Sequence, residues 1–387
     1  MIWLNVLIPI ILIIIGYIYF TKKIAWFESV IMLLIALATI GISKYSIETS
    51  MTNDVEYIQD YIVNSKYYEE WNEWIYQTCE TCTTDSEGNQ DCTTYDCSYQ
   101  DTHYAYWTVT TSNGKSYSVN RTEYDRLVRK FGIKPIFKDM HRDYDTQDGD
   151  MYYTKFDGDF SKLEYTTWEH TYENRVQASH TILNYEDVTE EQKKKYNLVD
   201  YPNIHNYYKA RSILGEKNKL DEYVNKMNSL ISNKKQVKIF YIIFKNQPRN
   251  ASLKQEQYWK RGNKNEVVIC IGLDKDRNIE WGNVFSWGEN NYVNVDIVSN
   301  IEKQKKLDNK TFKEIIDYSH KTTHEHFKRK KFSDFSYLRV DPSPRAMWIT
   351  FTIVLITNLG MLIFIIANDI DSDYSGNSGY NRFRRRF

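Results

Sequence analysis

The chain has 387 residues, a formal net charge of −1 and 15% aromatic residues, among them 32 tyrosines and 10 tryptophans. A near-neutral charge gives no global basic bias and argues against a nucleic-acid partner. The aromatic side chains supply area for burial and argue against a long disordered middle. The wealth of lysine, asparagine, isoleucine and tyrosine suits an AT-rich genome and favours a bacterial or phage source.

Three apolar segments predict membrane-spanning helices. Residues 2–20 and 347–367 carry no charge, and residues 24–43 carry only Glu28. Each segment is long enough to cross about 30 Å of hydrocarbon as a helix. A cleaved signal peptide is not expected, because the first segment lacks a basic leader and a second apolar segment follows almost at once.

Basic residues predict how the chain crosses the membrane. Lys22 and Lys23 lie between the first two spans, and residues 368–387 form a basic tail. Lysine and arginine are in excess on the cytoplasmic side of membrane proteins, so both segments are expected there. The N-terminus and residues 44–346 are then extracytoplasmic, in an integral, multi-pass protein whose first partner is the lipid bilayer.

Four of the five cysteines lie close together: Cys79, Cys82, Cys92 and Cys97. Folding this stretch back on itself as a hairpin brings Cys82 opposite Cys92. The same hairpin brings Cys79 opposite Cys97, which gives two nested disulfides suited to an oxidising compartment. The alternative is a zinc site, because C-x2-C and C-x4-C pairs on two loops can converge as four thiolates. Cys270 is expected to be a buried small apolar residue.

Residues 50–211 predict a mostly β outer domain. Aromatic and polar residues alternate from Tyr67 and again over 103–119, as in half-buried strands. The Asn113-Gly114 pair in the second stretch indicates a two-residue hairpin turn of the type that needs positive φ at both positions.

Short helices interrupt this β pattern. One is expected to begin at Thr122, with Asp125 in the capping-box position, and to end at Gly132. Residues 165–183 alternate as one long strand or two. A capping box at Thr189 opens a second short helix.

Residues 212–335 predict a different, α/β layer domain. Its expected elements are a helix from Leu220, a strand over 237–244, a helix over 252–261, strands over 266–273 and 279–287, and helices over 293–304 and from Thr311. This order favours one sheet with helices packed on it. The whole chain is therefore expected to be an α+β membrane protein with three transmembrane helices, a mostly β outer domain and an α/β outer domain.

The second outer region, residues 212–330, resembles the TPM domain family, whose members are extracytoplasmic domains tethered to membranes. The resemblance rests on the helix from Leu220, the strand over 237–244, the Tyr-Trp-Lys-Arg-Gly segment at 258–262 and the stretch VVICIGLDKDRNIEWG at 267–282. It implies the fold of the family. It also makes phosphatase activity, metal-ion binding and the assembly of membrane complexes expectations for this chain.

Five residues are candidate metal ligands. Asp274, Asp276 and Asp296 are the acidic residues nearest the places that the resemblance implies. His320 and His324 are one helical turn apart, so both imidazoles can reach one divalent cation. The competing interpretation is that the first two aspartates only form a turn and that His320 packs in a core. No other cofactor is indicated.

The favoured function is a membrane-anchored extracytoplasmic scaffold or protein-interaction module, whose partner is another membrane or envelope protein. Tyrosine and tryptophan are enriched at interfaces, and the sequence contains neither a Gly-rich phosphate loop nor a G-x-S-x-G motif. No catalytic residue is therefore assigned. The alternative, implied by the TPM resemblance, is an extracytoplasmic metal-dependent phosphohydrolase.

Overall fold

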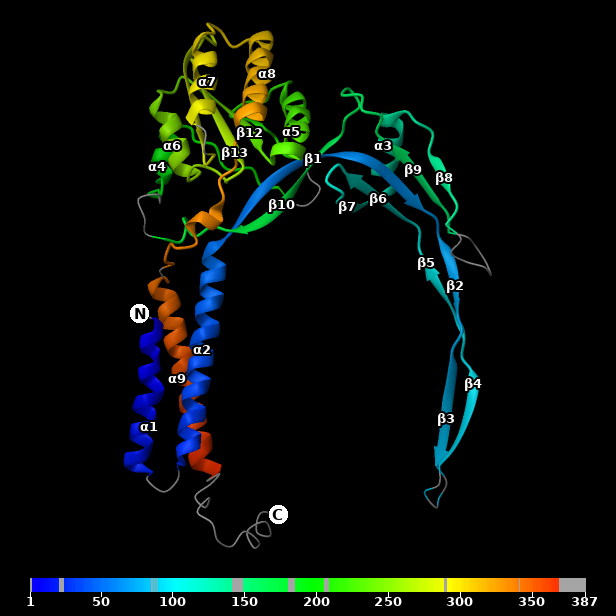
Figure 1. Cartoon of the computed structure of the whole chain (residues 1–387), viewed down its shortest axis with the longest axis vertical. Helices are drawn as coiled ribbons and strands as arrows, with labels where there is room; N and C mark the ends of the chain where they lie inside the picture. The colour runs from blue at the N-terminus through cyan, green and yellow to red at the C-terminus, as the bar shows by residue number, and fades with distance from the viewer. Residues whose placement is uncertain are drawn as a thin grey trace. The chain divides into compact units, whose positions relative to one another are not determined.

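The computed structural model describes residues 2–20, 24–84, 86, 88, 90–140, 149–179, 185–204, 209–288, 291–340 and 342–368 (Figure 1). Lys22, Lys23 and the basic tail beyond residue 368, on which the predicted orientation rests, lie outside the described residues. The chain forms two compact units. One contains residues 1–54, 171–184 and 332–387, and the other contains residues 55–170 and 185–331 and is here called the outer unit, because it holds most of the predicted outer region.

Three helices dominate the first unit: α1 (Leu7–Tyr19), α2 (Trp26–Thr52) and α9 (Pro344–Asn368). A 3-10 turn (Ile2–Val6) precedes α1, and another (Phe332–Phe335) precedes α9. Within the described part of the chain, three segments are long and apolar enough to cross a membrane: Ile2–Tyr19, Trp26–Thr52 and Pro344–Ala367.

Helix α2 is longer than predicted. The span was predicted to end at residue 43, but the helix continues through a polar segment to Thr52, and Lys44 pairs with Glu48 one turn later at 3.6 Å. Glu28, the single charge in the predicted span, lies in the first turn. Its Oε2 accepts a hydrogen bond from the backbone N of Ala25 at 2.8 Å, which satisfies a helix-terminal donor.

The three helices pack through small and branched side chains. Ile8 of α1, Ala36 of α2 and Val354 of α9 belong to one buried cluster. At Gly16, an added Cβ would lie 2.4 Å from the Cδ1 of Ile24, so glycine permits the close approach. Most other apolar side chains on these helices are exposed, which is compatible with helices long and apolar enough to cross a membrane.

A long strand, β1 (Asn53–Tyr68), is central to a six-stranded sheet. The sheet order is β7-β6-β1-β9-β8, and β10 also pairs with β1. The partner strands are β6 (Tyr106–Thr111), β7 (Ser116–Val119), β8 (Ile136–Lys138), β9 (Met151–Lys155) and β10 (Tyr165–Glu173). Tyr67 of β1 stacks between its register partners Trp107, at a centroid distance of 5.4 Å, and Tyr152, at 6.0 Å. Such cross-strand aromatic pairs stabilise a sheet.

The hairpin between β6 and β7 is present, but its turn differs from the predicted type. Of the two turn residues, only Gly114 has a positive φ, at 79°. The N of Thr111 donates to the O of Lys115 at 2.8 Å, and the N of Gly114 donates to the O of Thr111 at 2.9 Å. This is a three-residue loop with glycine in the left-handed position, the next commonest hairpin connection.

Two further local predictions need correction. Helix α3 (Arg121–Phe131) begins one residue before Thr122, because the side chain of Asn120 caps it by accepting from the N of Glu123 at 2.9 Å. It ends at left-handed Gly132, as predicted. The alternating segment over 165–183 is a strand only as far as Glu173, and residues 180–184 lie outside the described part. The predicted capping box at Thr189 opens α4 (Glu190–Lys195).

A second, four-stranded sheet has the order β11-β12-β13-β14. Its strands are β11 (Ile213–Leu214), β12 (Lys238–Lys245), β13 (Glu266–Leu273) and β14 (Ile279–Ser286), of which the first three are parallel and the last is antiparallel. The helices are α5 (Asp221–Lys235), α6 (Asn250–Tyr258), α7 (Asn291–Glu302) and α8 (Asn309–His326). Beyond the short β11, the element order is the predicted one. Helix α8 is capped by Asp308, which precedes the predicted start.

Both faces of this sheet are buried. Ile239, Tyr241 and Ile243 of β12 belong to one core cluster, and the alternate residues Phe240 and Ile242 belong to another. Helices therefore cover both faces, which explains why the sequences of these strands are almost continuously apolar. Cys270 of β13 is fully buried, and burial raises the pKa of its thiol.

Candidate interaction surface

The five candidate metal ligands do not form one site. Asp274 and Asp276 lie in the turn between β13 and β14, Asp296 lies on α7, and His320 and His324 lie on α8. Among the described residues, the only group of three or more histidine, cysteine or acidic side chains with ligand atoms within 4.8 Å of one another is Glu80, Cys82 and Cys92.

The side chains of Asp274 and Asp296 both accept hydrogen bonds from neighbouring protein groups. The Oδ1 of Asp274 accepts from the N of Asp276 at 2.9 Å and of Asn278 at 2.7 Å. The hydrogen bond from the Asn278 side chain also lowers the pKa of Asp274. The Oδ2 of Asp296 accepts from Tyr318 at 2.8 Å and from Thr322 at 3.1 Å, which joins α7 to α8. These contacts describe a turn and a helix–helix junction.

His320 is a core histidine in the structure. Its Nδ1 lies 2.8 Å from the O of Ile316, and its Nε2 lies 3.2 Å from the Oδ1 of Asn228. Burial lowers its pKa to about 4, so the imidazole is neutral near pH 7. His324, one turn away, is half-buried.

A different feature stands out in the outer unit: a two-stranded arm formed by residues 69–105, between β1 and β6 (Figure 1). Near its base, β2 (Trp71–Ile75) pairs with β5 (Tyr99–His103). Farther along, β3 (Thr78–Thr84) pairs with β4 (Gln90–Asp96). No described residue of the arm is buried, so the arm has no core. A two-stranded ribbon of this kind is marginal in water without additional support.

Two disulfides provide that support. Cys82 and Cys92 are direct register partners with Cα atoms 4.0 Å apart, and Cys79 is bonded to Cys97 with Cα atoms 5.7 Å apart. These are the pairs that the nested hairpin predicted. Because Cys79 and Cys82 are three residues apart on one strand, the disulfides lie on opposite faces of the ribbon. Closing either loop alone is worth about 3 kcal/mol.

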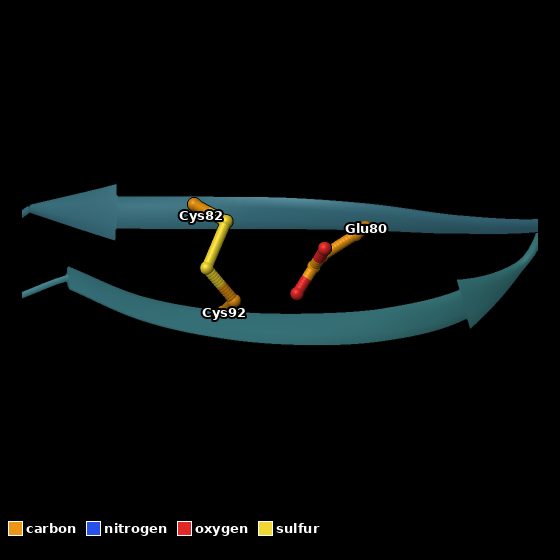
Figure 2. A group of neighbouring side chains, drawn as sticks. All are labelled: Glu80, Cys82 and Cys92. Carbon is orange, nitrogen blue, oxygen red and sulfur yellow. A yellow bond between two sulfur atoms is a disulfide. The ribbon is translucent and has the colours of Figure 1, made fainter.

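The disulfides rule out the alternative of a zinc site at these four cysteines, because no free thiol remains among them. Figure 2 shows Glu80 beside the bond that joins Cys82 to Cys92, and these three residues are the metal-like group of the described chain. A zinc site needs deprotonated thiols, and sulfurs bonded to each other cannot supply them.

Aromatic and charged side chains define the base of the arm. The rings of Trp71 and His103 are stacked with centroids 4.2 Å apart. The Nε2 of His103 lies 2.9 Å from a carboxylate oxygen of Glu73 and 4.0 Å from one of Asp101. Gly149 fits against Trp71, since an added Cβ would lie 2.5 Å from its Cγ.

The charge of the arm is entirely of one sign. Residues 69–105 contain nine aspartates and glutamates, whereas all 50 lysines and arginines lie elsewhere in the chain. Among the described residues, the arm carboxylates form ion pairs only with His103. Its large exposed aromatic residues are Trp74 (43%), Tyr76 (78%), Tyr95 (53%), Tyr99 (51%) and Tyr104 (76%).

The sequence interpretation missed the arm as a surface, although the signals were present. The absence of basic residues over 69–105 can be counted directly, and the disulfide hairpin was expected. What the sequence did not reveal is that no described residue of the ribbon is buried, so that several of its aromatic side chains are exposed.

No family model, curated protein or solved structure matches the chain. The resemblance of residues 212–330 to the TPM family therefore stays a prediction.

Proposed function

We propose that the chain is a membrane-anchored extracytoplasmic scaffold or interaction module, and that the arm is its contact element for another membrane or envelope protein. One observation carries the proposal: a ribbon whose described residues are all at least partly exposed is held in shape by two disulfides. A surface that is ordered before it binds loses less conformational entropy on association.

The side chains on the ribbon support this role. Trp74, Tyr95 and Tyr99 are all more than two-fifths exposed. Tryptophan and tyrosine are the residues most enriched at the energetic centres of interfaces, because they bury a large area with few rotatable bonds. A single exposed aromatic residue is normal on a protein surface, but several exposed aromatic residues on one narrow ribbon form a contact surface.

The anchor and the compartment are supported separately. Three helices with exposed apolar surfaces suit a bilayer. Disulfides form and persist outside the cytoplasm, which agrees with the predicted placement of residues 44–346.

In-cell photo-crosslinking tests the proposal. A photoreactive amino acid replaces Tyr99 on the arm and, as a control, Tyr292 on α7, which is 62% exposed in the same outer unit. We expect a discrete protein adduct from position 99 and none of the same mass from position 292. Failure to obtain an adduct from position 99, and likewise from positions 76 and 95, in a chain that reaches the membrane would rule out the arm as contact element.

A further inference from the structure

The arm carries negative charge, and among the described residues only His103 lies within ion-pair distance of its carboxylates. Glu73 and Asp101 lie near its base. Farther along, on the β3–β4 ribbon that the disulfides cross-link, lie Glu80, Asp91 and Asp96. No lysine or arginine occurs over 69–105, and none of the described ones lies within ion-pair distance of these carboxylates. One sign of charge along a narrow element creates a field that attracts the opposite charge and suppresses wrong partners.

Two acidic residues of the arm face each other across a strand pair, with the imidazole of His103 beside them. Glu73 and Asp101 are direct register partners on β2 and β5. Like charges placed directly opposite each other destabilise a strand pair. A lysine at either position would stabilise the isolated ribbon, and a cation supplied by a partner would do the same on binding.

The aromatic residues are suited to cationic side chains. The rings of Trp74 and Tyr76 lie 6.5 Å apart in an edge-to-face arrangement, and both are exposed. Lysine and arginine bind over the faces of such rings, with tryptophan the best acceptor. Carboxylates beside exposed indole and phenol rings therefore offer both of the contacts that a guanidinium group makes.

From these features we infer that the arm docks on a cationic protein surface, one rich in lysine and arginine. The inference rests on the proposed function and names the chemistry of the partner. A second copy of the arm is a poor occupant, because two acidic ribbons repel and charged edges prevent strand pairing. A metal ion is a poor occupant too, because the only described metal-like group contains a disulfide.

The test uses the full chain in lipid nanodiscs and a labelled lysine- and arginine-rich peptide, with an acidic peptide of equal length as the negative probe. One variant removes five charges from the arm: Glu73→Gln, Glu80→Gln, Asp91→Asn, Asp96→Asn and Asp101→Asn. The matched control removes five exposed charges elsewhere in the outer unit: Glu190→Gln, Glu191→Gln, Asp276→Asn, Glu280→Gln and Glu314→Gln.

We expect the native chain to bind the basic peptide and not the acidic one. The affinity should fall about tenfold in the arm variant and stay within about twofold in the control, since five exposed pairs each contribute a fraction of that change. Binding should also weaken as salt rises, because the screening length shortens. Protection of the arm cysteines from alkylation without reductant verifies that the arm variant still folds.

Equal losses in both variants, or a loss in neither, would overturn the inference. So would arm-dependent binding of Ca²⁺ alone, or arm-dependent self-association at low salt. Crosslinking separates this failure from that of the proposed function. If position 99 forms its adduct equally well in the arm variant, the arm is a contact element whose partner is not cationic. If position 99 forms no adduct, the proposed function itself fails.

Discussion

Cys82 and Cys92 face each other directly across β3 and β4, with Cα atoms 4.0 Å apart. The neighbouring register pair, Thr81 and Thr93, has no covalent link. Because the ribbon has no core, the covalent links carry the order that packing supplies elsewhere in the chain.

Replacing Cys82 and Cys92 with serine should loosen the arm and leave the rest of the outer unit folded. The loss of loop closure, worth about 3 kcal/mol, should raise amide exchange in β3 and β4 but not in β12. Hydrogen-exchange mass spectrometry of the full chain measures both. Replacing Thr81 and Thr93 with serine is the control, and unchanged exchange in β3 and β4 of the cysteine variant would contradict the role of the disulfide.

Lys238 should impose a pH dependence on stability. It is fully buried, and its Nζ has no hydrogen-bond acceptor among the described residues. Burial lowers its pKa to about 7, whereas the unfolded side chain keeps a pKa near 10.5. Between these values the unfolded state binds more protons, so the free energy of unfolding rises with pH from about 7 toward 10.

Lys238→Met should remove this rise and increase stability near pH 7 by about 1–4 kcal/mol, because methionine fills the space without a buried amine. Melting temperatures at pH 7, 8 and 9 test both effects. Lys234→Met, at an exposed position of α5, should keep the native pH profile. A lower melting temperature at pH 7 in the Lys238 variant would show that the amine is stabilising.

Glu56 joins distant parts of the outer unit. It is fully buried, its Oε1 lies 2.8 Å from the Nδ1 of His170 and 3.7 Å from the Nζ of Lys264, and it pairs with Arg329. Glu56→Gln should cost about 3–5 kcal/mol, since it leaves cationic groups around a buried neutral side chain. Urea unfolding followed by tryptophan fluorescence measures the loss. Glu70→Gln, on the exposed arm, should change little, and an equally small change at position 56 would contradict the prediction.

Gly149→Ala should disturb the base of the arm. Gly149 has φ +52°, and an added Cβ would lie 2.5 Å from the Cγ of Trp71. Gly158→Ala is a matched control, because its φ is +91° but nothing lies within 4 Å of the added Cβ. Both changes strain the backbone, but only the first should displace Trp71 from its stack on His103, at a cost of about 1–3 kcal/mol. Equal amide exchange of β2 and β5 in the two variants would argue against this steric role.

The sequence predicted elements whose apolar pattern matches their burial. Strands β12 and β13 are buried on both faces and appear as unbroken apolar runs, so their order with the flanking helices was predicted. Strand β1 was predicted only from Tyr67, because Glu56, Gln59 and Asp60 are polar yet buried. Gln59, for example, donates to the Oδ1 of Asn225 at 2.6 Å, a contact 166 residues away that no local pattern reveals.

In the candidate site, too, the sequence predicted local contacts and missed those that depend on tertiary packing. Pairing of Cys82 with Cys92 follows from spacing within one hairpin, which is local information. The spacing of His320 and His324 suggested a shared cation, but the packing of α8 on the sheet directs His320 to Asn228 instead. Whether an aromatic residue such as Tyr99 fills a core or a surface depends on what packs over the ribbon, which is tertiary information.

The central claim is that the arm is cross-linked by two disulfides and lies outside the cytoplasm. Alkylation of the cysteines in the full chain tests it most directly. Membranes from cells that produce it are denatured and alkylated without reductant, and the intact mass is measured. We expect one alkylated cysteine, Cys270, with the other four protected as disulfides. Alkylation of all five would place the arm in a reducing compartment without its disulfides, and the proposed extracytoplasmic contact element would fall with it.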